Sequence, residues 1–105
     1  MQNWNNLSFN NVRTEQAQAA VGYSIWANVN TGNRLVGLKI NNSQLDATMR
    51  DVFINNVQNV TIENTEFGCT GATIALDMSR SNDAVRLIND HFETACTIAT
   101  PAVRR

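Results

Sequence analysis

The chain has little charge, no strongly basic stretch and no long apolar run. Only 16% of its 105 residues are charged, and eight basic and nine acidic residues give a net charge of -1. Without a basic stripe we expect no nucleic-acid partner. No apolar run approaches the ~20 residues of a membrane-spanning helix, so we expect no membrane insertion. The first residues also lack the basic and apolar regions that are typical of a secretory leader.

Cysteine and histidine are equally scarce. Cys69 and Cys96 are too few for a disulfide scaffold and form no CxxC pair of the metal-binding type. We interpret them as two small buried side chains, with a bridge as the alternative if the fold brings them together. His91 is the only histidine, and on an extended segment it points away from its neighbour Asp90, so we expect no metal site. No phosphate loop, nucleotide fingerprint or Ser-His-Asp arrangement indicates a cofactor.

Glycine and proline are also few, with five glycines and the single Pro101. Turns must therefore use Asn, Asp and Ser, and asparagine is indeed abundant. Alternating apolar and polar residues, many of them β-branched, predict strands along most of the chain. The exception is RTEQAQAAV, from Arg13 to Val21, which we interpret as about two turns of helix or as a loop.

One short pattern occurs four times, as LSFNNV, LKINNSQL, VTIENTEF and VRLINDHF. The copies align on one asparagine, which is preceded by apolar residues at two and four positions before it. These asparagines are Asn11, Asn42, Asn64 and Asn89, spaced 31, 22 and 25 residues apart. A strand directs alternate side chains to one face, so each copy predicts a strand, a turn and a second short strand. Asparagine suits such a turn because it tolerates the left-handed region, and stacked copies would form an amide ladder.

A further strand is expected after each copy. These strands would contain Ile25, Met49, Ile74 and Ile98. Recurrence every 22 to 31 residues predicts a solenoid of stacked coils with a continuous core. The segment VFINNV also fits the pattern. We place Val52–Ile54 in the last strand of the second coil, and Asn55 and Asn56 in the corner that follows.

The segment NVTIENTEF, with its asparagine corner and flanking apolar residues, resembles the right-handed parallel β-helices of the pectin-lyase-like superfamily. The resemblance runs from about Leu7 to Ile98. It implies an all-β parallel β-helix of about three to four coils over residues 1–105, with residues 1–6 as an N-terminal cap and 99–105 as a C-terminal tail. The chain would be either a whole protein or a segment of a larger spike.

That superfamily includes pectate lyases, polygalacturonases and bacteriophage tailspikes. The Asn-rich, Lys-poor composition is most similar to that of the tailspikes, which are usually homotrimers that bind, and often cleave, bacterial surface polysaccharide. The resemblance therefore implies a homotrimer that is made in the host cytoplasm, resides in the phage tail and contacts a surface glycan.

Candidate site residues lie two and four positions after the aligned asparagine, where stacked copies would share one outward side. Glycoside cleavage commonly needs two carboxylates, and Glu66 would lie near Glu93 or Asp90 on the adjacent coil. The alternative is that these three are solvated surface residues. Arg13 and Gln44 stand in the same row as Glu66 and are candidate substrate-binding residues.

Trp26 is the remaining candidate for substrate binding. It alternates with Ile25 in its strand, so an inward Ile25 predicts an outward Trp26, which would serve as a sugar platform or as a subunit contact. Three functions therefore stay open: a glycan-binding segment of a trimeric spike, a glycan-depolymerising endoglycosidase or lyase, and a purely architectural module. A cleaving groove normally spans many coils, so the short chain favours the first and the third.

Overall fold

A computed structural model describes residues 3–14, 23–30, 32–47, 50–69, 74–79, 82–93 and 96–100. Within these ranges every regular element is a strand, and no helix occurs. Most of the segment expected as helix or loop, residues 15–21, lies outside the described residues, as does Met49.

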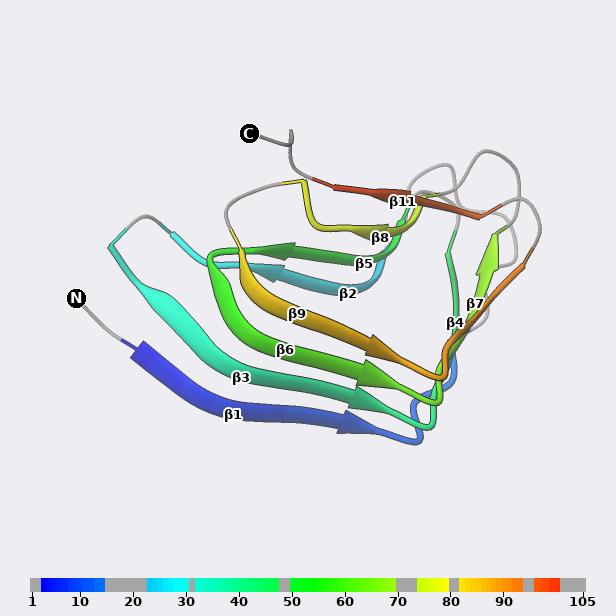
Figure 1. Cartoon of the computed structure of the whole chain (residues 1–105), viewed down its shortest axis with the longest axis horizontal. Coiled ribbons are helices and arrows are strands. Elements are labelled where there is room, and N and C mark those ends of the chain that lie inside the picture. Colours follow the sequence, from blue (N-terminus) through cyan, green and yellow to red (C-terminus); the bar gives the residue numbers. More distant parts are fainter. Residues whose placement is uncertain are drawn as a thin grey trace.

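The described strands form three sheets in which all neighbouring strands are parallel (Figure 1). Sheet A contains β1 (Asn3–Asn10), β3 (Arg34–Asn41), β6 (Val57–Glu63) and β9 (Asp83–Ile88). Sheet B contains β4 (Gln44–Ala47), β7 (Glu66–Cys69) and β10 (His91–Phe92). Sheet C contains β2 (Tyr23–Asn28), β5 (Arg50–Asn55), β8 (Ile74–Asp77) and β11 (Thr97–Ala99). The chain visits A, B and C in turn and then returns to the next strand of A, a passage that we call a circuit.

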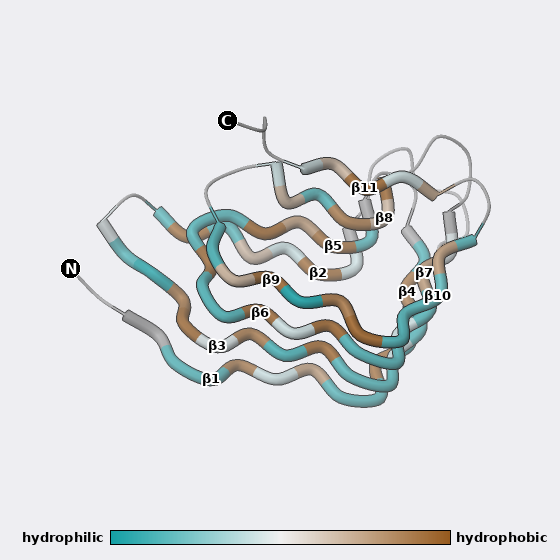
Figure 2. Tube along the Cα trace, viewed as in Figure 1, coloured by the Kyte–Doolittle hydropathy of each residue, from teal (hydrophilic) through white to brown (hydrophobic). Residues whose placement is uncertain are grey.

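The core lies between sheets A and C and is bounded on one side by sheet B (Figure 1). Figure 2 shows apolar and polar residues alternating along the strands of sheet A. The parallel register aligns equivalent residues of the repeat in rows, as the sequence predicts. The rows of sheet A are Leu7, Leu38, Val60 and Val85, and Phe9, Ile40, Ile62 and Leu87. Their central members are fully buried, whereas Leu7 and Leu87 in the outermost strands stay 43% and 37% exposed because a strand covers only one side of each.

Sheet B contributes one inward row, Leu45, Phe67 and Phe92. The rings of Phe67 and Phe92 stack with centroids 4.6 Å apart and planes 3° from parallel. Leu45 and Phe67 are buried, with 1% and 0% of their surfaces exposed. The aromatic row therefore fills the side of the core where sheets A and C are joined.

Sheet C contains Ile25, Ile74 and Ile98 in β2, β8 and β11, as predicted, but these residues do not form one row. Ile25 pairs with Val52, Val52 with Leu76 and Leu76 with Ile98, whereas Ile74 pairs with Arg50. This difference arises because the number of residues between sheets B and C is not the same in every circuit. Counting from the aligned asparagine therefore fixes the register of sheets A and B but not that of sheet C.

The asparagine corners adopt the predicted left-handed conformation. Asn11, Asn42, Asn64 and Asn89 have φ values of 60°, 51°, 51° and 54°. Nδ2 of Asn89 donates to Oδ1 of Asn64 at 2.7 Å, which is one rung of the expected amide ladder. Asn56, at φ 60°, connects β5 to β6, which confirms that VFINNV ends one circuit and turns into the next.

A second left-handed row crosses the middle of sheet A and was not predicted. It consists of Asn6, Gly37, Asn59 and Ala84, at φ 60°, 87°, 59° and 55°. One such residue interrupts the alternation of a strand, and this explains why Leu35 and Leu38, three positions apart, are both buried. A Cβ on Gly37 would come within 2.7 Å of Oδ1 of Asn6, so this circuit also needs glycine for space.

Ala84 is the member of this row least suited to its conformation, because its Cβ is unfavourable in the left-handed region. We expect Ala84→Gly to raise the free energy of unfolding by about 0.5–1 kcal/mol, measured by urea denaturation. Ala75→Gly is the matched control. Ala75 is buried in β8 at an ordinary φ, so the same change there should cost about 1 kcal/mol. If both variants lost the same amount of unfolding free energy, Ala84 would not be strained by its left-handed conformation.

Candidate functional site

Polar side chains form two rows on the outward side of sheet B. In the first row, Arg13 forms a β-bridge with Gln44, Gln44 pairs with Glu66, and Glu66 pairs with His91. In the second row Asp46 pairs with Gly68. Both rows agree with the sequence alignment, because they depend only on the invariant step from sheet A to sheet B.

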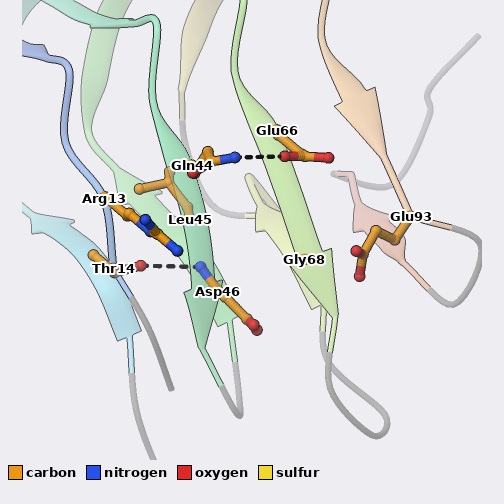
Figure 3. A pocket seen from close by; sticks show the side chains of 8 residues that line it. All are labelled: Arg13, Thr14, Gln44, Leu45, Asp46, Glu66, Gly68 and Glu93. Carbon is orange, nitrogen blue, oxygen red and sulfur yellow. Dashed lines mark hydrogen bonds between the residues drawn. The ribbon is translucent and has the colours of Figure 1, made fainter. Parts of the chain in front are cut away.

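Glu93 extends the second row beyond β10. Its N–H donates to the carbonyl oxygen of Phe67 at 3.1 Å, which places Glu93 next to Gly68. Figure 3 shows the Glu93 side chain extending toward Gly68. The structure thus brings two of the three predicted acids, Glu66 in β7 and Glu93 directly after β10, to the same side of sheet B.

These rows enclose a hollow of about 140 Å³ (Figure 3). It is lined by Arg13, Thr14, Gln44, Leu45, Asp46, Glu66, Gly68 and Glu93. We call it the sheet B hollow. A Cβ on Gly68 would lie 3.1 Å from Cγ of Asp46, so the missing side chain at this position leaves space between Asp46 and Glu93.

Hydrogen bonds fix part of the lining. Nε2 of Gln44 donates to Oε1 of Glu66 at 2.9 Å, which joins the amide and the carboxylate of adjacent strands (Figure 3). Oγ1 of Thr14 accepts from the N–H of Asp46 at 2.9 Å and lies 2.7 Å from Oγ of Ser24. Three carboxylates, one amide and the guanidinium of Arg13 therefore lie on one small surface, and these formal charges sum to -3 + 1 = -2.

No protein-family model, curated protein or solved structure matches this chain.

The side chains around the hollow offer hydrogen bonds and charge. Among the described residues, no group of three or more His, Cys, Asp and Glu side chains is arranged to hold a metal ion. The described ranges also contain no helix that is long and apolar enough to cross a membrane. Directed polar binding of a small ligand, or proton transfer by a pair of carboxylates, is the chemistry that this lining offers.

Asp90, the third predicted acid, does not line the hollow. It follows the corner Asn89, and its Oδ1 accepts from the N–H of Thr65 at 3.0 Å. Ser43 plays the equivalent role in an earlier circuit, where its Oγ accepts from the N–H of Val12 at 3.1 Å. The carboxylate of Asp90 therefore joins neighbouring corners of the stack.

Burial raises the pKa of Asp90 above the ordinary 3.8, and the negative charge of Glu63 acts in the same direction. Hydrogen bonds with the backbone of Thr65 and Ile88 oppose this rise. A raised pKa means that the folded chain holds the proton more tightly than the unfolded chain. The Asp90 contribution to stability is therefore greatest at low pH and declines as pH rises from about 3.8 through the folded-state pKa.

We expect Asp90→Asn to keep an acceptor for the N–H of Thr65 and to remove the cost of the buried charge. The variant should melt at a higher temperature than wild type at pH 7, and the difference should shrink as the pH falls toward 3.8. Thermal melts followed by circular dichroism between pH 3 and pH 7 measure this difference. A variant less stable than wild type at pH 7 would show that the negative charge stabilises the corner.

Trp26 lies on β2 in sheet C and does not line the sheet B hollow. Its side chain is 52% exposed, and the neighbouring Ile25 is buried, which confirms the outward orientation predicted from alternation. The indole lies against Phe53, with ring centroids 4.7 Å apart. Together with Asn5, Asn6 and Asn28 it borders a separate, larger hollow of about 430 Å³. The structure therefore assigns Trp26 to a different surface from Arg13, Gln44 and Glu66.

The favoured interpretation of the cysteines as two small buried side chains was wrong, and the alternative, a bridge, is confirmed. Cys96 is disulfide-bonded, and its sulfur lies 3.4 Å from the carbonyl oxygen of Phe67. The chain contains only one further cysteine, Cys69, at the end of β7. The alignment contained a signal for the bridge. Cys69 follows Asn64, and Cys96 follows Asn89, at similar distances in adjacent circuits.

Sequence reasoning placed Asp46 and Gly68 in the correct row but did not select them. Asp46 supplies a carboxylate to the hollow, and Gly68 supplies its space. The sequence did contain a signal for this space, because in the aligned row a glycine, Gly68, stands between two acidic residues, Asp46 and Glu93. The importance of a missing side chain becomes clear only when the neighbouring Cβ positions are known.

Proposed function

We propose that the chain is a segment of a right-handed parallel β-helix of the tailspike kind, which binds host-surface polysaccharide through the sheet B hollow. Three parallel sheets visited in a fixed order support this architecture, as do the left-handed asparagine corners. Such a stack gives a rigid, flat face on which side chains from successive circuits lie side by side.

The observation that carries the proposal is the convergence of Arg13, Gln44, Asp46, Glu66 and Glu93 on one hollow. Sugar hydroxyls both donate and accept hydrogen bonds. Carboxylates accept such bonds, a guanidinium donates them, and an amide does both. A binding site for a polyol needs these groups fixed on a firm scaffold, and parallel strands supply that scaffold.

A second candidate function is cleavage of the bound glycan. Glu66 in β7 and Glu93, which directly follows β10, line the same hollow, and glycoside hydrolysis commonly uses two carboxyl groups on either side of the scissile bond. One would protonate the leaving oxygen, and the other would activate water or attack the anomeric carbon. Under this proposal Asp90 takes no part, because its carboxylate is bonded within the corner.

We further propose that the segment acts as a homotrimer in the virion of a bacteriophage. The exposed indole of Trp26, which lies on Phe53, supports a subunit contact on sheet C, since aromatic residues are enriched in the cores of interfaces. Light scattering of the purified chain should give about three times its 11.6 kDa mass. In the same measurement Trp26→Ala should shift the mass toward that of the monomer, and a monomeric wild-type chain would refute the trimer.

Binding and cleavage are distinguished by one experiment. Purified bacterial surface polysaccharides are incubated with wild type, Glu66→Gln and Asp83→Asn, and both bound protein and new reducing ends are measured. Asp83 is exposed on sheet A and does not line the hollow, so its variant is the control for loss of one negative charge. We expect binding that Glu66→Gln weakens and Asp83→Asn leaves unchanged.

New reducing ends that depend on Glu66 and Glu93 would select the enzyme. Binding without release would select the binding segment. If no polysaccharide of the panel is bound or cut, the glycan proposal fails and a purely architectural module is left.

A further inference from the structure

We propose that copies of this chain stack head to tail, so that the last circuit of one copy pairs with the first circuit of the next. The contact lies away from the sheet B hollow and is independent of glycan binding. We call the side of the stack formed by β1 and β2 the first end, and the side formed by β9 and β11 the last end. Three features point to the contact: open strand edges, uncovered apolar residues and a conformational match between the two ends.

The strand edges at both ends of the stack are open. Among the described residues, β1 and β2 at the first end and β9 and β11 at the last end each pair with a strand on one side only (Figure 1). The sequences of β1 and β2, NWNNLSFN and YSIWAN, contain no charged residue and no proline. Charge and proline are the features by which edge strands commonly resist pairing, so the first end is suited to accept a further parallel strand.

The core is uncovered at the first end. A hollow of about 430 Å³ lies there, and Leu7, Phe9 and Ile25 are among the residues of β1 and β2 that line it. Leu7 is 43% exposed although its row is buried in the central strands. The end circuits of a stable solenoid normally have a polar outer face, and the described strands at this end lack one.

The last end has apolar side chains to fill this hollow. Leu87 and Ile98 belong to the inward rows, yet 37% and 39% of their surfaces are exposed. If the register inside the chain continues into a second copy, Leu87 lies beside Phe9 of that copy, and Ile98 lies beside its Ile25. The same stacking that buries the rows within one chain would then bury them between chains.

A conformational match selects a second copy over an unrelated peptide. Each strand of sheet A has one left-handed residue within it and another directly after it, five positions further on. These pairs are Asn6 and Asn11 at β1, and Ala84 and Asn89 at β9. A strand that pairs with β9 must follow the irregularity at Ala84, and a regular strand would lose its register there. The first strand of another copy has the required irregularity at the required distance from its corner.

Charge does not oppose this arrangement. The outward charged residues of β9 are Asp83 and Arg86, and their rows continue to Asn5 and Ser8 of the next copy. Both partners are uncharged, so no like charges meet at the new pairing. The contact joins two different surfaces and leaves one open end on each side, so it generates a linear rod that grows with concentration.

Two variants that block opposite ends test this arrangement. Leu7→Lys places a charge at the first end, and Leu87→Lys places one at the last end, where burial would leave the charge without a partner. Thr61→Lys is the control, because it adds the same charge on the outward face of the central strand β6. Light scattering over a series of concentrations measures the mass, and circular dichroism confirms that each variant is folded.

We expect the mass of wild type and of Thr61→Lys to rise steadily with concentration. Leu7→Lys and Leu87→Lys should each keep a constant mass, that of one unit, because each has only one usable end. Mixed together, they should form a complex of about twice the unit mass and stop, since the two remaining ends fit each other. An unfolded variant could not form this complex.

Three results would overturn the stacking. The wild-type mass could stay constant with concentration, the mixed variants could fail to associate, or either variant alone could associate as wild type does. The unit mass reports separately on the proposed trimer. A unit of one chain would refute the trimer and leave the stacking in place, and glycan binding by the blocked variants tests the proposed function independently of both.

Discussion

Replacing Phe67 by alanine is expected to lower the free energy of unfolding by about 3–5 kcal/mol. The side chain is 0% exposed, stacks on Phe92 and belongs to the aromatic row of sheet B. Its removal takes away buried apolar surface and leaves a cavity that the surrounding parallel strands cannot close. Because small domains are stable by only about 5–15 kcal/mol, urea denaturation should show a large loss or a chain that is already unfolded.

Phe92→Ala is the matched control for this prediction. Phe92 lies in the same row but belongs to the outermost strand of sheet B and is only partly buried. The same truncation there should cost about 1–2 kcal/mol, because less surface is uncovered and the site can relax toward solvent. Equal losses for the two variants, or a loss below about 1 kcal/mol at Phe67, would contradict the position of Phe67 at the centre of the core.

Loss of the disulfide should have the second largest effect. Cys96→Ser is expected to lower the free energy of unfolding by about 2–4 kcal/mol, because the unfolded chain gains freedom that the bridge removes. Denaturation of wild type with and without a thiol reductant, beside the variant, measures the effect. The reduced wild-type protein should resemble Cys96→Ser, and adding reductant to the variant should change nothing.

A thiol titration of the denatured, unreduced protein provides an independent check. The structure predicts no reactive thiol in this sample and two after reduction, since the chain contains two cysteines. Two thiols without reductant, together with unchanged stability of Cys96→Ser, would restore the interpretation of the cysteines as small buried side chains.

The rows of sheets A and B could be predicted from the sequence because the step between these sheets is invariant. Leu7 and Arg13, Leu38 and Gln44, Val60 and Glu66, and Val85 and His91 are all separated by six positions. The asparagine corner fixes this step, and its left-handed conformation follows from the side chain itself. Aligning four corners was therefore enough to bring Arg13, Gln44 and Glu66 together.

Other features could not be derived in this way. The connection from sheet B to sheet C varies in length, so the register of Val52 and Leu76 was missed. The second left-handed row was missed because its members do not share a residue type, and Ala84 gives no signal of that conformation. The hollow also depends on Gly68, where an absent side chain acts through its neighbour Asp46.

The contrast between invariant and variable steps has a consequence for how this chain can change in length. An insertion between β3 and β4 or between β6 and β7 would displace an asparagine corner from its neighbours and disturb the stack on both sides. An insertion between sheets B and C would leave those contacts in place, since connections of two different lengths already occur there: two residues join β4 to β5, and four join β7 to β8 and β10 to β11. The latter connections are the natural positions at which to graft foreign peptides, so that the strands become a scaffold for their display.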